Sequence, residues 1–576
     1  MSYFLKKTKV LNKGIYLQIY YSYYIPKVGK RNKSYKAIGY IDDLIKKGIS
    51  DPIKYYQGIV DKLNNENNNN RPLIGDTSPT KNIGYFLIKA LLDKLDIDKT
   101  LNIFTKPYKT SFKMSDFLRC MIYSQIVSPG SKLKAFEKVI PSLYKVDTYS
   151  YDQILDTINF IGSDYEKYIE LFNYQMNKVY KIDIMNKENK NVYFDCTNYY
   201  FEIDLEDDIR KKGPSKENRK SPIISQALLL DSSRIPIGMK MFSGNESEKP
   251  KLREMIEDTK NRYDIVGRTI QVADKGLNCA KNIYSASVES NDGYIFSKSI
   301  KGKAISINER KLIMEDDDKF KWVDVLDDDG LIKYSYKEYK GKFRYSFKDD
   351  DGKEIEFEKR EKRVLTYNPS LAKKQKLEIN KLVEKARNNI SIKSALKDEY
   401  GESIKYVLFE PVNSSGDSVK VNSILNQDKI NEDLSLCGYN LLVTSEVNMD
   451  AKEIYNIYHG LSKIEESFRI MKSYLEARPV FLQLKESIYG HFLICYLSLV
   501  VLRLLELKEF NEKISVSEIV NYIREFNATL TDNMIYVNNT SKTKYYIKIK
   551  EALGLYKIGC LYLKEKEIDN IINYEL

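Results

Sequence analysis

The chain has 576 residues, which is too many for one compact core, so we expect about two to four domains. Its net charge of +12, from 93 Lys and Arg against 81 Asp and Glu, favours a polyanionic partner such as nucleic acid. With two histidines and six cysteines that form no C-x-x-C pair, the composition argues against a histidine-rich metal site, a Ser-His-Asp triad, a zinc ribbon and a disulfide framework.

The N-terminal residues predict a small β-rich unit. KGIYLQIYYSYY and SYKAIGYI are β-prone aromatic runs, and the basic, turn-forming segment IPKVGKRNK separates them. The N-terminus itself, MSYFLKKTKV, lacks the apolar core of a signal peptide, and no window of the chain approaches about eighteen uninterrupted apolar residues. We therefore expect a cytoplasmic protein with no membrane partner.

A polar tract and a helical region follow. NNENNNNRP, residues 64–72, cannot bury apolar surface, and we interpret it as a linker. From about residue 83 to 182 the apolar residues recur three and four apart, as in GYFLIKALLDKLDI and MSDFLRCMIYSQIV. This period predicts helices with one buried face.

The pattern then changes to strands. Four short apolar runs are bounded by turn residues: NVYFDCT (191–197), IISQALLLD (223–231), IPIGMKMFSG (235–244) and RTIQVAD (268–274). Helical patterns lie between the third and fourth runs, in KPKLREMIEDTKNRY, and after the fourth, in LNCAKNIYSA. This order predicts an α/β layer with a mixed sheet.

Residues of about 300 to 445 interrupt this layer. KFRYSFKDDDGKEIEFEKR predicts a hairpin around Asp-Gly, and LAKKQKLEINKLVEKARNN predicts a charged helix. Apolar character resumes at CGYNLLVTSE, and from Asp450 to about residue 508 the chain is helical again. We interpret the interruption as a mainly β insertion inside the α/β domain.

Two aspartates close apolar runs of the predicted sheet, Asp195 in VYFD and Asp274 in IQVAD. Strand ends of α/β folds are where ligand sites form, and two carboxylates that converge there repel each other unless a proton or a cation bridges them. With oxygen ligands and almost no histidine, the cation would be Mg²⁺ or Mn²⁺. A strand-end aspartate that merely caps a turn or a helix is the alternative.

A third carboxylate lies in YHGLSKIEESFRIMKSYLEARPVF, residues 458–481. At about 3.6 residues per turn, four of its residues share one helical face: Tyr458, Leu461, Glu465 and Lys472. Arg469 joins this face, four residues after Glu465. A helix packed against the two strand ends would add Glu465 to the aspartates, whereas a solvated face with a Glu-x3-Arg ion pair is the alternative.

These residues resemble bacterial insertion-sequence transposases of the DDE superfamily, in the branch marked by Y-x2-R-x3-E-x6-K. The matching blocks are YFDCTNYYFE, VADKGLNCAKNI and the segment from Tyr458 to Phe481, with further similarity in residues 210–250 and in YGHFLICYLSLVVLRLLE. The resemblance covers roughly residues 190–300 and 440–508, and it rests on the ordered set of blocks.

The resemblance implies an α/β fold with an RNase H-like catalytic core that a β-rich insertion splits before the glutamate helix. It implies Asp195, Asp274 and Glu465 as a catalytic triad that holds two divalent cations, Mg²⁺ or Mn²⁺. Such cations activate the attacking hydroxyl and stabilise the leaving oxygen of an in-line displacement. It also implies that Tyr458 and Lys472 hold DNA phosphates near the cut.

One position departs from the family motif. The family arginine falls at Leu461, which carries no charge, and Arg469 or Lys463 are the candidates to replace it. Glu466 rivals Glu465 as the third ligand, but Glu465 keeps the register with Tyr458 and Lys472.

A basic loop follows Asp195. RKKGPSKENRK, residues 210–220, includes four cations that we predict contact DNA phosphates from an extended arm: Arg210, Lys212, Lys216 and Arg219. A solvated loop is the alternative. KPYKTSFK (106–113) is a weaker basic candidate.

These interpretations divide the chain into seven segments. They are a β-rich unit (1–63), a linker (64–82), a helical domain that is a candidate for DNA binding (83–185), the first part of the core (186–299), the insertion (300–445), the second part of the core with the glutamate helix (446–510) and a C-terminal region (511–576).

The resemblance implies a cut-and-paste transposase that acts as a homodimer on double-stranded DNA with terminal inverted repeats and on target DNA, associated with the nucleoid when bound. Two alternatives stay open at this point: a catalytically inactive DNA-binding protein derived from a transposase, and a stand-alone RNase H-like nuclease.

Overall fold

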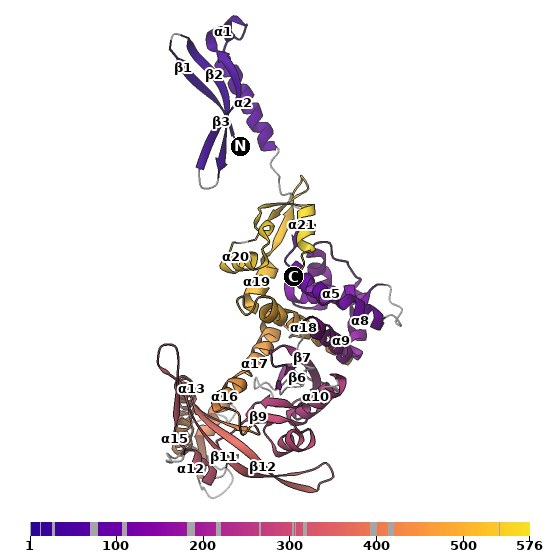
Figure 1. Cartoon of the computed structure of the whole chain (residues 1–576), viewed down its shortest axis with the longest axis vertical. Helices are drawn as coiled ribbons and strands as arrows, with labels where there is room; N and C mark the ends of the chain where they lie inside the picture. Colours follow the sequence, from indigo (N-terminus) through magenta and orange to yellow (C-terminus); the bar gives the residue numbers. More distant parts are fainter. Residues whose placement is uncertain are drawn as a thin grey trace. The chain divides into compact units, whose positions relative to one another are not determined.

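The structure is a computed structural model, and it describes residues 2–11, 13–25, 29–69, 79–105, 112–180, 190–214, 221–263, 267–301, 305, 307–314, 320–391, 400–412, 420–540 and 542–576. The chain separates into two compact units. One comprises Met1–Lys81, Asn527–Thr540 and Gly559–Asn570, and the other comprises Asn82–Phe526, Ser541–Ile558 and Ile571–Leu576. The predicted α/β class is confirmed, since many helices accompany a large mixed sheet (Figure 1).

The first unit contains the predicted N-terminal strands. β1 (Ser2–Val10), β2 (Gly14–Ile25) and β3 (Gly29–Tyr40) form an antiparallel sheet, and helices α1 (Ile41–Lys46) and α2 (Pro52–Asn69) follow. A four-stranded sheet belongs mainly to this unit as well, in the order β18 (Tyr562–Lys564), β17 (Ile535–Asn538), β16 (Asn527–Leu530), β4 (Thr80–Asn82).

The polar tract at residues 64–72 differs from the linker that we predicted, because α2 continues through it to Asn69. The side chain of Asn64 explains part of this extension. Its Oδ1 accepts a hydrogen bond from the backbone N–H of Tyr3 at 2.7 Å, and its Nδ2 donates to the Tyr3 carbonyl at 2.9 Å. The polar side chain of Asn64 is therefore accommodated in the helix, because it forms hydrogen bonds with backbone groups of β1. Residues 70–78 of the predicted linker lie outside the described residues.

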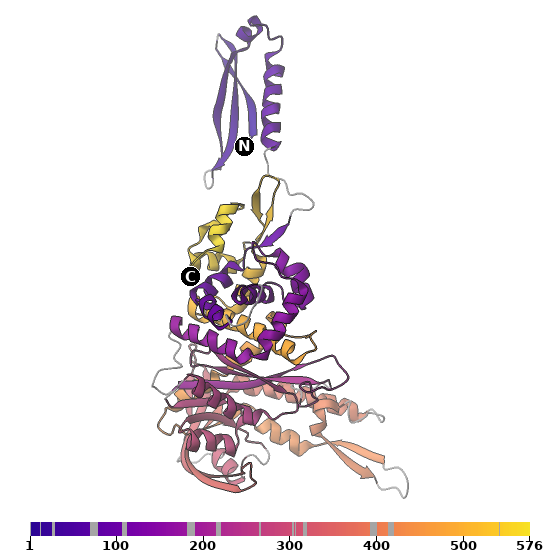
Figure 2. The same ribbon diagram turned by 90° about the vertical axis from the view of Figure 1, so that its right-hand side faces the viewer.

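The second unit begins with the predicted helical region. Its main helices are α3 (Phe86–Lys94), α4 (Ile97–Thr105), α5 (Met114–Val127), α8 (Tyr151–Ser163) and α9 (Tyr165–Tyr180). Helices α5, α8 and α9 contact α18 (Lys485–Leu504), which is buried along nearly its whole length (Figures 1 and 2). Segments more than 300 residues apart in the sequence thus share one helical core.

The apolar stretch Lys485–Glu509, which includes α18, is by length and composition able to cross a membrane. However, 94% of its most apolar window is buried inside the structure. The helix therefore has the environment of a core helix, which is compatible with a soluble protein.

The large sheet of the second unit has nine strands in the order β10-β11-β12-β15-β9-β8-β5-β6-β7. The four runs predicted as strands form β5 (Lys190–Tyr200), β6 (Ile223–Leu230), β7 (Pro236–Ser243) and β8 (Thr269–Ala273), and β9 (Gly293–Lys298) follows. β5 pairs antiparallel with β6 and parallel with β8, whereas β8 and β9 are parallel. The predicted helices are present as α10 (Glu248–Tyr263) and α11 (Ala280–Tyr284).

The insertion extends this sheet. Its predicted hairpin is formed by β11 (Ile332–Lys348) and β12 (Glu354–Tyr367), and β12 pairs with β15 (Tyr439–Thr444), which pairs with β9. β10 (Val323–Leu326) is the edge strand. The remaining elements of the insertion are α12 (Ile307–Met314), α13 (Pro369–Ser391), η6 (Gly401–Tyr406), β13 (Val407–Val412), β14 (Lys420–Leu425) and α15 (Gln427–Ser435). The predicted charged helix is α13.

Candidate active site

Asp195 and Asp274 lie at the same level on neighbouring parallel strands. The pairing of β5 with β8 runs from Lys190 and Thr269 to Phe194 and Ala273, so the next residue on each strand is one of the aspartates. Neighbouring strands are about 4.8 Å apart, and residues at one level of a sheet point to the same face. The structure thus brings the two backbones together, as the sequence predicted.

Asp195 does not end its strand, which differs from our prediction. β5 continues for five residues beyond it, to Tyr200, because the strand keeps its antiparallel partner β6 up to the pair Tyr200–Ile223. The parallel pairing of β5 with β8 ends just before Asp195, because β8 stops at Ala273. Asp195 is half-buried, and its Oδ1 accepts a hydrogen bond from the backbone N–H of Cys196 at 2.8 Å.

Asp274 follows β8 directly and is exposed. Its Oδ1 accepts hydrogen bonds from the Ser297 hydroxyl at 2.9 Å and from the Tyr458 hydroxyl at 3.1 Å. Burial, followed by the charge of Asp274, raises the pKa of Tyr458, so the phenol remains a hydrogen-bond donor at neutral pH. Tyr458 is therefore engaged with a candidate catalytic carboxylate.

The segment that follows Tyr458 crosses the face of β5 on which Asp195 lies. Side chains alternate along a strand, so Tyr193, Asp195 and Tyr199 share one face. Gly460 meets this face at Tyr193, because a Cβ at residue 460 would lie 2.5 Å from the Tyr193 hydroxyl oxygen. Twelve residues later, the Lys472 Nζ lies 5.4 Å from the centre of the Tyr199 ring. Glu465 lies between these two contacts in the sequence, on a helix that contacts β5.

The predicted single helix is interrupted. It is divided into α16 (Ala451–His459), α17 (Ser462–Arg469) and the π-helical turn η7 (Ile470–Tyr474). Hydrogen bonds from residue i+3 to residue i tighten the backbone at Leu461, and the wider turn of η7 shifts the phase again. The predicted common face is not kept: Leu461 is buried, Lys472 is half-buried, and Glu465 and Arg469 are exposed.

Glu465 and Glu466 have different environments. The exposed side chain of Glu465 forms no hydrogen bond or ion pair with any residue that the structure describes. Glu466 instead forms ion pairs with Lys463 at 3.0 Å and with Arg503 at 3.4 Å, and the Arg503 side chain is fully buried. Glu466 thus neutralises a cation of the core, and Glu465 is the carboxylate left accessible to a ligand.

The cations proposed to contact DNA differ in their exposure. Arg469 is 68% exposed, and its Nη2 lies 3.7 Å from Glu466 Oε1. Arg210, in contrast, is buried. Its guanidinium forms an ion pair with Asp207 at 2.5 Å and donates to Gln483 Oε1 at 3.0 Å. The prediction that the basic loop presents Arg210 is therefore wrong, because this side chain is used to join the loop to a distant segment.

Other cations of the loop have a different status. Lys212 is exposed and directly precedes Gly213. Lys216 and Arg219 lie outside the described residues, as does most of KPYKTSFK. Of the four predicted loop cations, Lys212 is the one that the structure describes as accessible.

A basic cavity that the sequence did not reveal begins at Lys275, the residue after Asp274. It has a volume of about 540 Å³, and its cationic lining residues are Lys275, Lys298, Lys301, Lys381 and Lys405. Burial, followed by the charge of Arg363, lowers the pKa of Lys298 to about 8. The sequence could have indicated Lys275 as a site residue, because it follows the aspartate in VADKGLN. Lys381 and Lys405 come from the insertion and could not be placed in this way.

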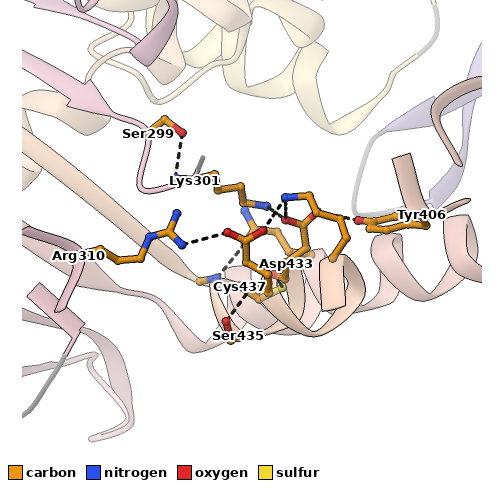
Figure 3. A network of polar contacts seen from close by, with 11 residues as sticks. Ser299, Lys301, Arg310, Tyr406, Asp433, Ser435 and Cys437 are labelled. Carbon is orange, nitrogen blue, oxygen red and sulfur yellow. Dashed lines mark hydrogen bonds and ion pairs between the residues drawn. The ribbon is translucent and has the colours of Figure 1, made fainter. Parts of the chain in front are cut away.

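A polar network fixes one wall of this cavity. Lys301 and Tyr406 both point toward Asp433, with Nζ–Oδ1 and hydroxyl–Oδ2 distances of 3.1 and 3.0 Å (Figure 3). Asp433 is buried, and its ion pair with Lys301 and hydrogen bonds hold its pKa below the ordinary range against the opposing effect of burial. The network joins the segment after β9 to α15 and η6 of the insertion.

The candidate triad matches a hard divalent cation in chemistry but is not assembled. Its donors would all be carboxylate oxygens, which Mg²⁺ and Mn²⁺ prefer. Among the described residues, no group of three or more His, Cys, Asp and Glu side chains is arranged to hold a metal ion. The structure thus places the two aspartates on adjacent strands but does not bring Glu465 into one cluster with them.

Comparisons with known proteins add no relative. No protein-family model matches the chain, and no curated protein matches it either.

Proposed function

We propose that the chain is a cut-and-paste DNA transposase that binds insertion-sequence ends and catalyses metal-dependent strand cleavage and strand transfer. The observation that carries this proposal is the position of Asp195 and Asp274 at one level of the adjacent parallel strands β5 and β8. The segment with Glu465, an accessible carboxylate, crosses the same face of β5.

The strand order supports an RNase H-like core. β7, β6 and β5 form an antiparallel set, and β8 and β9 then add parallel strands on the other side of β5. This arrangement of three antiparallel strands and two parallel additions is the one expected of that core. Carboxylates at the point where β5 loses its parallel partner agree with the placement of sites in α/β sheets.

Asp195, Asp274 and Glu465 would hold the divalent cations, which supply activation of the attacking oxygen and stabilisation of the leaving oxygen when bound. In cleavage, the oxygen of a water molecule forms a bond to phosphorus and loses its proton, and the P–O3′ bond breaks. The departing 3′ oxygen takes up a proton and becomes the 3′-hydroxyl that later attacks a phosphorus of target DNA. Tyr458 keeps Asp274 in place through the hydrogen bond that its hydroxyl donates to Oδ1.

The distribution of cations supports DNA as the polyanion. Lys275 and Lys298 line the cavity beside Asp274, and Arg469 and Lys212 are exposed. Contacts of lysine and arginine with phosphates release counterions, so the affinity for DNA should fall steeply with salt. Assembly as a homodimer on two DNA ends is part of the proposal.

A catalytically inactive DNA-binding protein is the second candidate, and Leu461 favours it. This residue occupies the position of the family arginine, and only 8% of it is exposed. It is therefore a packing residue that contacts no phosphate. Arg469 is the accessible cation on the same helix that could take over the role.

The proposal is tested by strand cleavage of the element's own end DNA with Mg²⁺ or Mn²⁺. Asp195→Ala, Asp274→Ala and Glu465→Ala should each reduce cleavage by at least about a thousandfold, since each removes a ligand of the reacting centre. DNA binding should persist in all three. Glu453→Ala is the matched control, because Glu453 is an exposed carboxylate of α16 that is not one of the three proposed ligands.

The outcomes separate the candidates. Cleavage that survives loss of any one carboxylate would remove that residue from the triad. A wild type that binds the ends but cuts them with neither metal would favour the inactive DNA-binding protein. A preference for branched DNA over insertion-sequence ends would favour a stand-alone nuclease.

A further inference from the structure

A second cavity, of about 600 Å³, is lined by none of the three candidate carboxylates and has no role in the proposed reaction. Its walls come from two segments that are distant in the sequence, Pro129–Lys134 and Pro479–Leu482, together with Glu476, Tyr151 and His491. The volume is within the range of about 300–1,000 Å³ that is typical of small-molecule sites.

Lys132 is the unusual residue of this cavity, because it is buried without a counter-ion. It is 6% exposed, and its Nζ donates a hydrogen bond to Gln125 Oε1 at 3.2 Å. Gln125 is itself fixed, since its Nε2 donates to the Leu475 carbonyl at 2.6 Å. Within the described part of the chain, no carboxylate forms an ion pair with Lys132. Burial lowers the pKa of Lys132, because a buried ammonium group is costly unless an anion compensates its charge.

The neighbours of Lys132 do not supply that anion. Burial, followed by the charge of Lys132, lowers the pKa of His491 to about 3, so the imidazole is neutral at pH 7. Its Nε2 lies 3.1 Å from the Ala477 carbonyl oxygen. Burial raises the pKa of Cys495 to about 12, so this thiol is neutral as well. Among the residues that line the cavity, the buried polar side chains are thus those of Lys132 and the neutral His491.

The exposed part of the lining contains one lysine and one glutamate, Lys134 and Glu476, beside apolar and aromatic groups. Phe481 is 64% exposed and Leu133 is 44% exposed, although both are large and hydrophobic. Tyr151 lines the cavity from the first residue of α8 and is half-buried. Aromatic side chains of this kind stack on nucleobases. A ligand that satisfies both regions carries an anionic head and a flat, apolar body.

We infer that this cavity binds a nucleoside monophosphate, with the phosphate against Lys132 and the base against Phe481 and Tyr151. The ligand is either a free nucleotide or the 5′-phosphorylated end of a DNA strand, which offer the same chemistry. The inference goes beyond the proposed transposase activity and does not depend on it, because none of the three candidate carboxylates lines the cavity.

The test is calorimetric titration of the full-length protein with AMP and, separately, with adenosine. Wild type should bind AMP saturably and adenosine at least about tenfold more weakly, since a charge-assisted hydrogen bond is lost with the phosphate. Lys132→Met should weaken AMP at least about tenfold for the same reason. Phe481→Ala, an exposed position whose change leaves the core intact, should weaken AMP about threefold to tenfold. Lys138→Met is the matched control, because Lys138 is exposed nearby and does not line the cavity.

Competition identifies the source of the nucleotide. If a 5′-phosphorylated oligonucleotide displaces AMP and its 5′-hydroxyl counterpart does not, the ligand is a DNA end; if neither displaces AMP, it is a free nucleotide. Both outcomes retain the inference. It is overturned if AMP does not bind saturably, if adenosine binds as tightly as AMP, or if Phe481→Ala and a folded Lys132→Met both bind AMP like wild type.

Discussion

The two halves of the nine-stranded sheet are stabilised by different interactions. In the half that contains β6 and β8, every residue of these two strands is buried, and most of them are apolar. In the half contributed by the insertion, β11 and β12 bury charged side chains instead: Lys337, Glu361, Lys362 and Arg363. β9 joins the two halves and carries Ser297, which donates a hydrogen bond to Asp274.

The charged half depends on one connected network. Glu361 is fully buried and accepts hydrogen bonds from the hydroxyls of Tyr294 and Tyr345 at 2.5 and 2.7 Å. Arg363 donates to Glu361 through Nε at 3.2 Å and also meets Glu309. The stability of the apolar half therefore depends on how well its side chains fill the core, and that of the charged half depends on charge balance. The charged half is therefore the one that a change of charge or pH should loosen.

The largest expected effect is that of Arg363→Met. It leaves Glu361 and Glu309 without the guanidinium, and removal of one partner of a buried ion pair costs about 3–5 kcal/mol. Hydrogen exchange of the β11 and β12 amides should show this loss. The double variant Glu361→Gln with Arg363→Met should recover at least half of the loss, because both charges are then absent. A double variant that is as unstable as the single one would contradict the charge-balance account.

Leu228→Ala tests the apolar half in the same way. Leu228 is fully buried in β6, and truncation of a buried leucine costs about 2–5 kcal/mol. The loss should appear in the exchange of β5 and β6 amides and should be the same at pH 6 and pH 8. If its size instead followed pH, the two halves would not differ as described.

The two halves of the sheet should also differ in how their stability depends on pH. Burial raises the pKa of Glu361 to about 7, opposed by the hydrogen bonds from Tyr294 and Tyr345. Between the ordinary value of 4.5 and about 7, the folded protein binds the additional proton, so its stability falls as pH rises through this window. Each unit by which the pKa is raised corresponds to about 1.4 kcal/mol.

The measurement is exchange protection of the β12 amides from pH 5 to pH 8. Protection, corrected for the intrinsic exchange rate, should decline with pH in wild type and remain flat in Glu361→Gln. Arg363 and Lys298 also face Glu361, and both keep their charge over most of this range, since burial lowers their pKa values only to about 9 and about 8. An equal decline in the Gln variant would assign the effect to another group.

Gly460→Ala tests where the glutamate segment meets the apolar half. A Cβ would come within 2.5 Å of the Tyr193 hydroxyl, so either the segment or the buried Tyr193 ring beside Asp195 must move. Displacement of a reacting group by about 1 Å can cost about 100-fold in rate, and we expect cleavage to fall about 10- to 100-fold with DNA binding retained. Gly276→Ala is the matched control, because no atom lies within 4 Å of a Cβ there. If both variants cleaved DNA equally well, Gly460 would have no role in positioning the site.

Tyr458→Phe should have the smallest effect. It removes the hydroxyl that donates to Asp274 but leaves the Ser297 hydrogen bond to the same oxygen atom. Loss of one such bond corresponds to about 1–2 kcal/mol, so cleavage should fall about 5- to 30-fold. A loss as large as that of Asp274→Ala would show that Tyr458 acts directly on DNA.

Local patterns predicted most elements of the large sheet and the strands beside both aspartates, although β5 continues beyond Asp195. Apolar runs closed by Asp195 and Asp274 marked β5 and β8, and their parallel register followed from the strand pairing. The sequence did not reveal that the insertion continues the same sheet, because the pairing of β15 with β9 joins residues almost 150 positions apart. Such long-range pairing leaves no local periodic signal.

The sequence also did not predict which side chains contact residues that are distant along the chain. Arg210 reads as one of several loop cations, and its burial depends on Gln483, which is 273 residues away. The close approach at Gly460 involves Tyr193, whose hydroxyl occupies the space of a side chain. The preference for Glu465 over Glu466 rested on spacing, and the ion pair of Glu466 with Arg503 now gives it a physical reason.

Mn²⁺ binding followed by electron paramagnetic resonance tests most directly whether the two aspartates share a cation. We predict that wild type binds Mn²⁺. Asp195→Asn and Asp274→Asn should each weaken Mn²⁺ binding at least about tenfold, while Glu453→Gln should not. Unchanged binding in both aspartate variants would contradict the account, because the metal would then lie elsewhere.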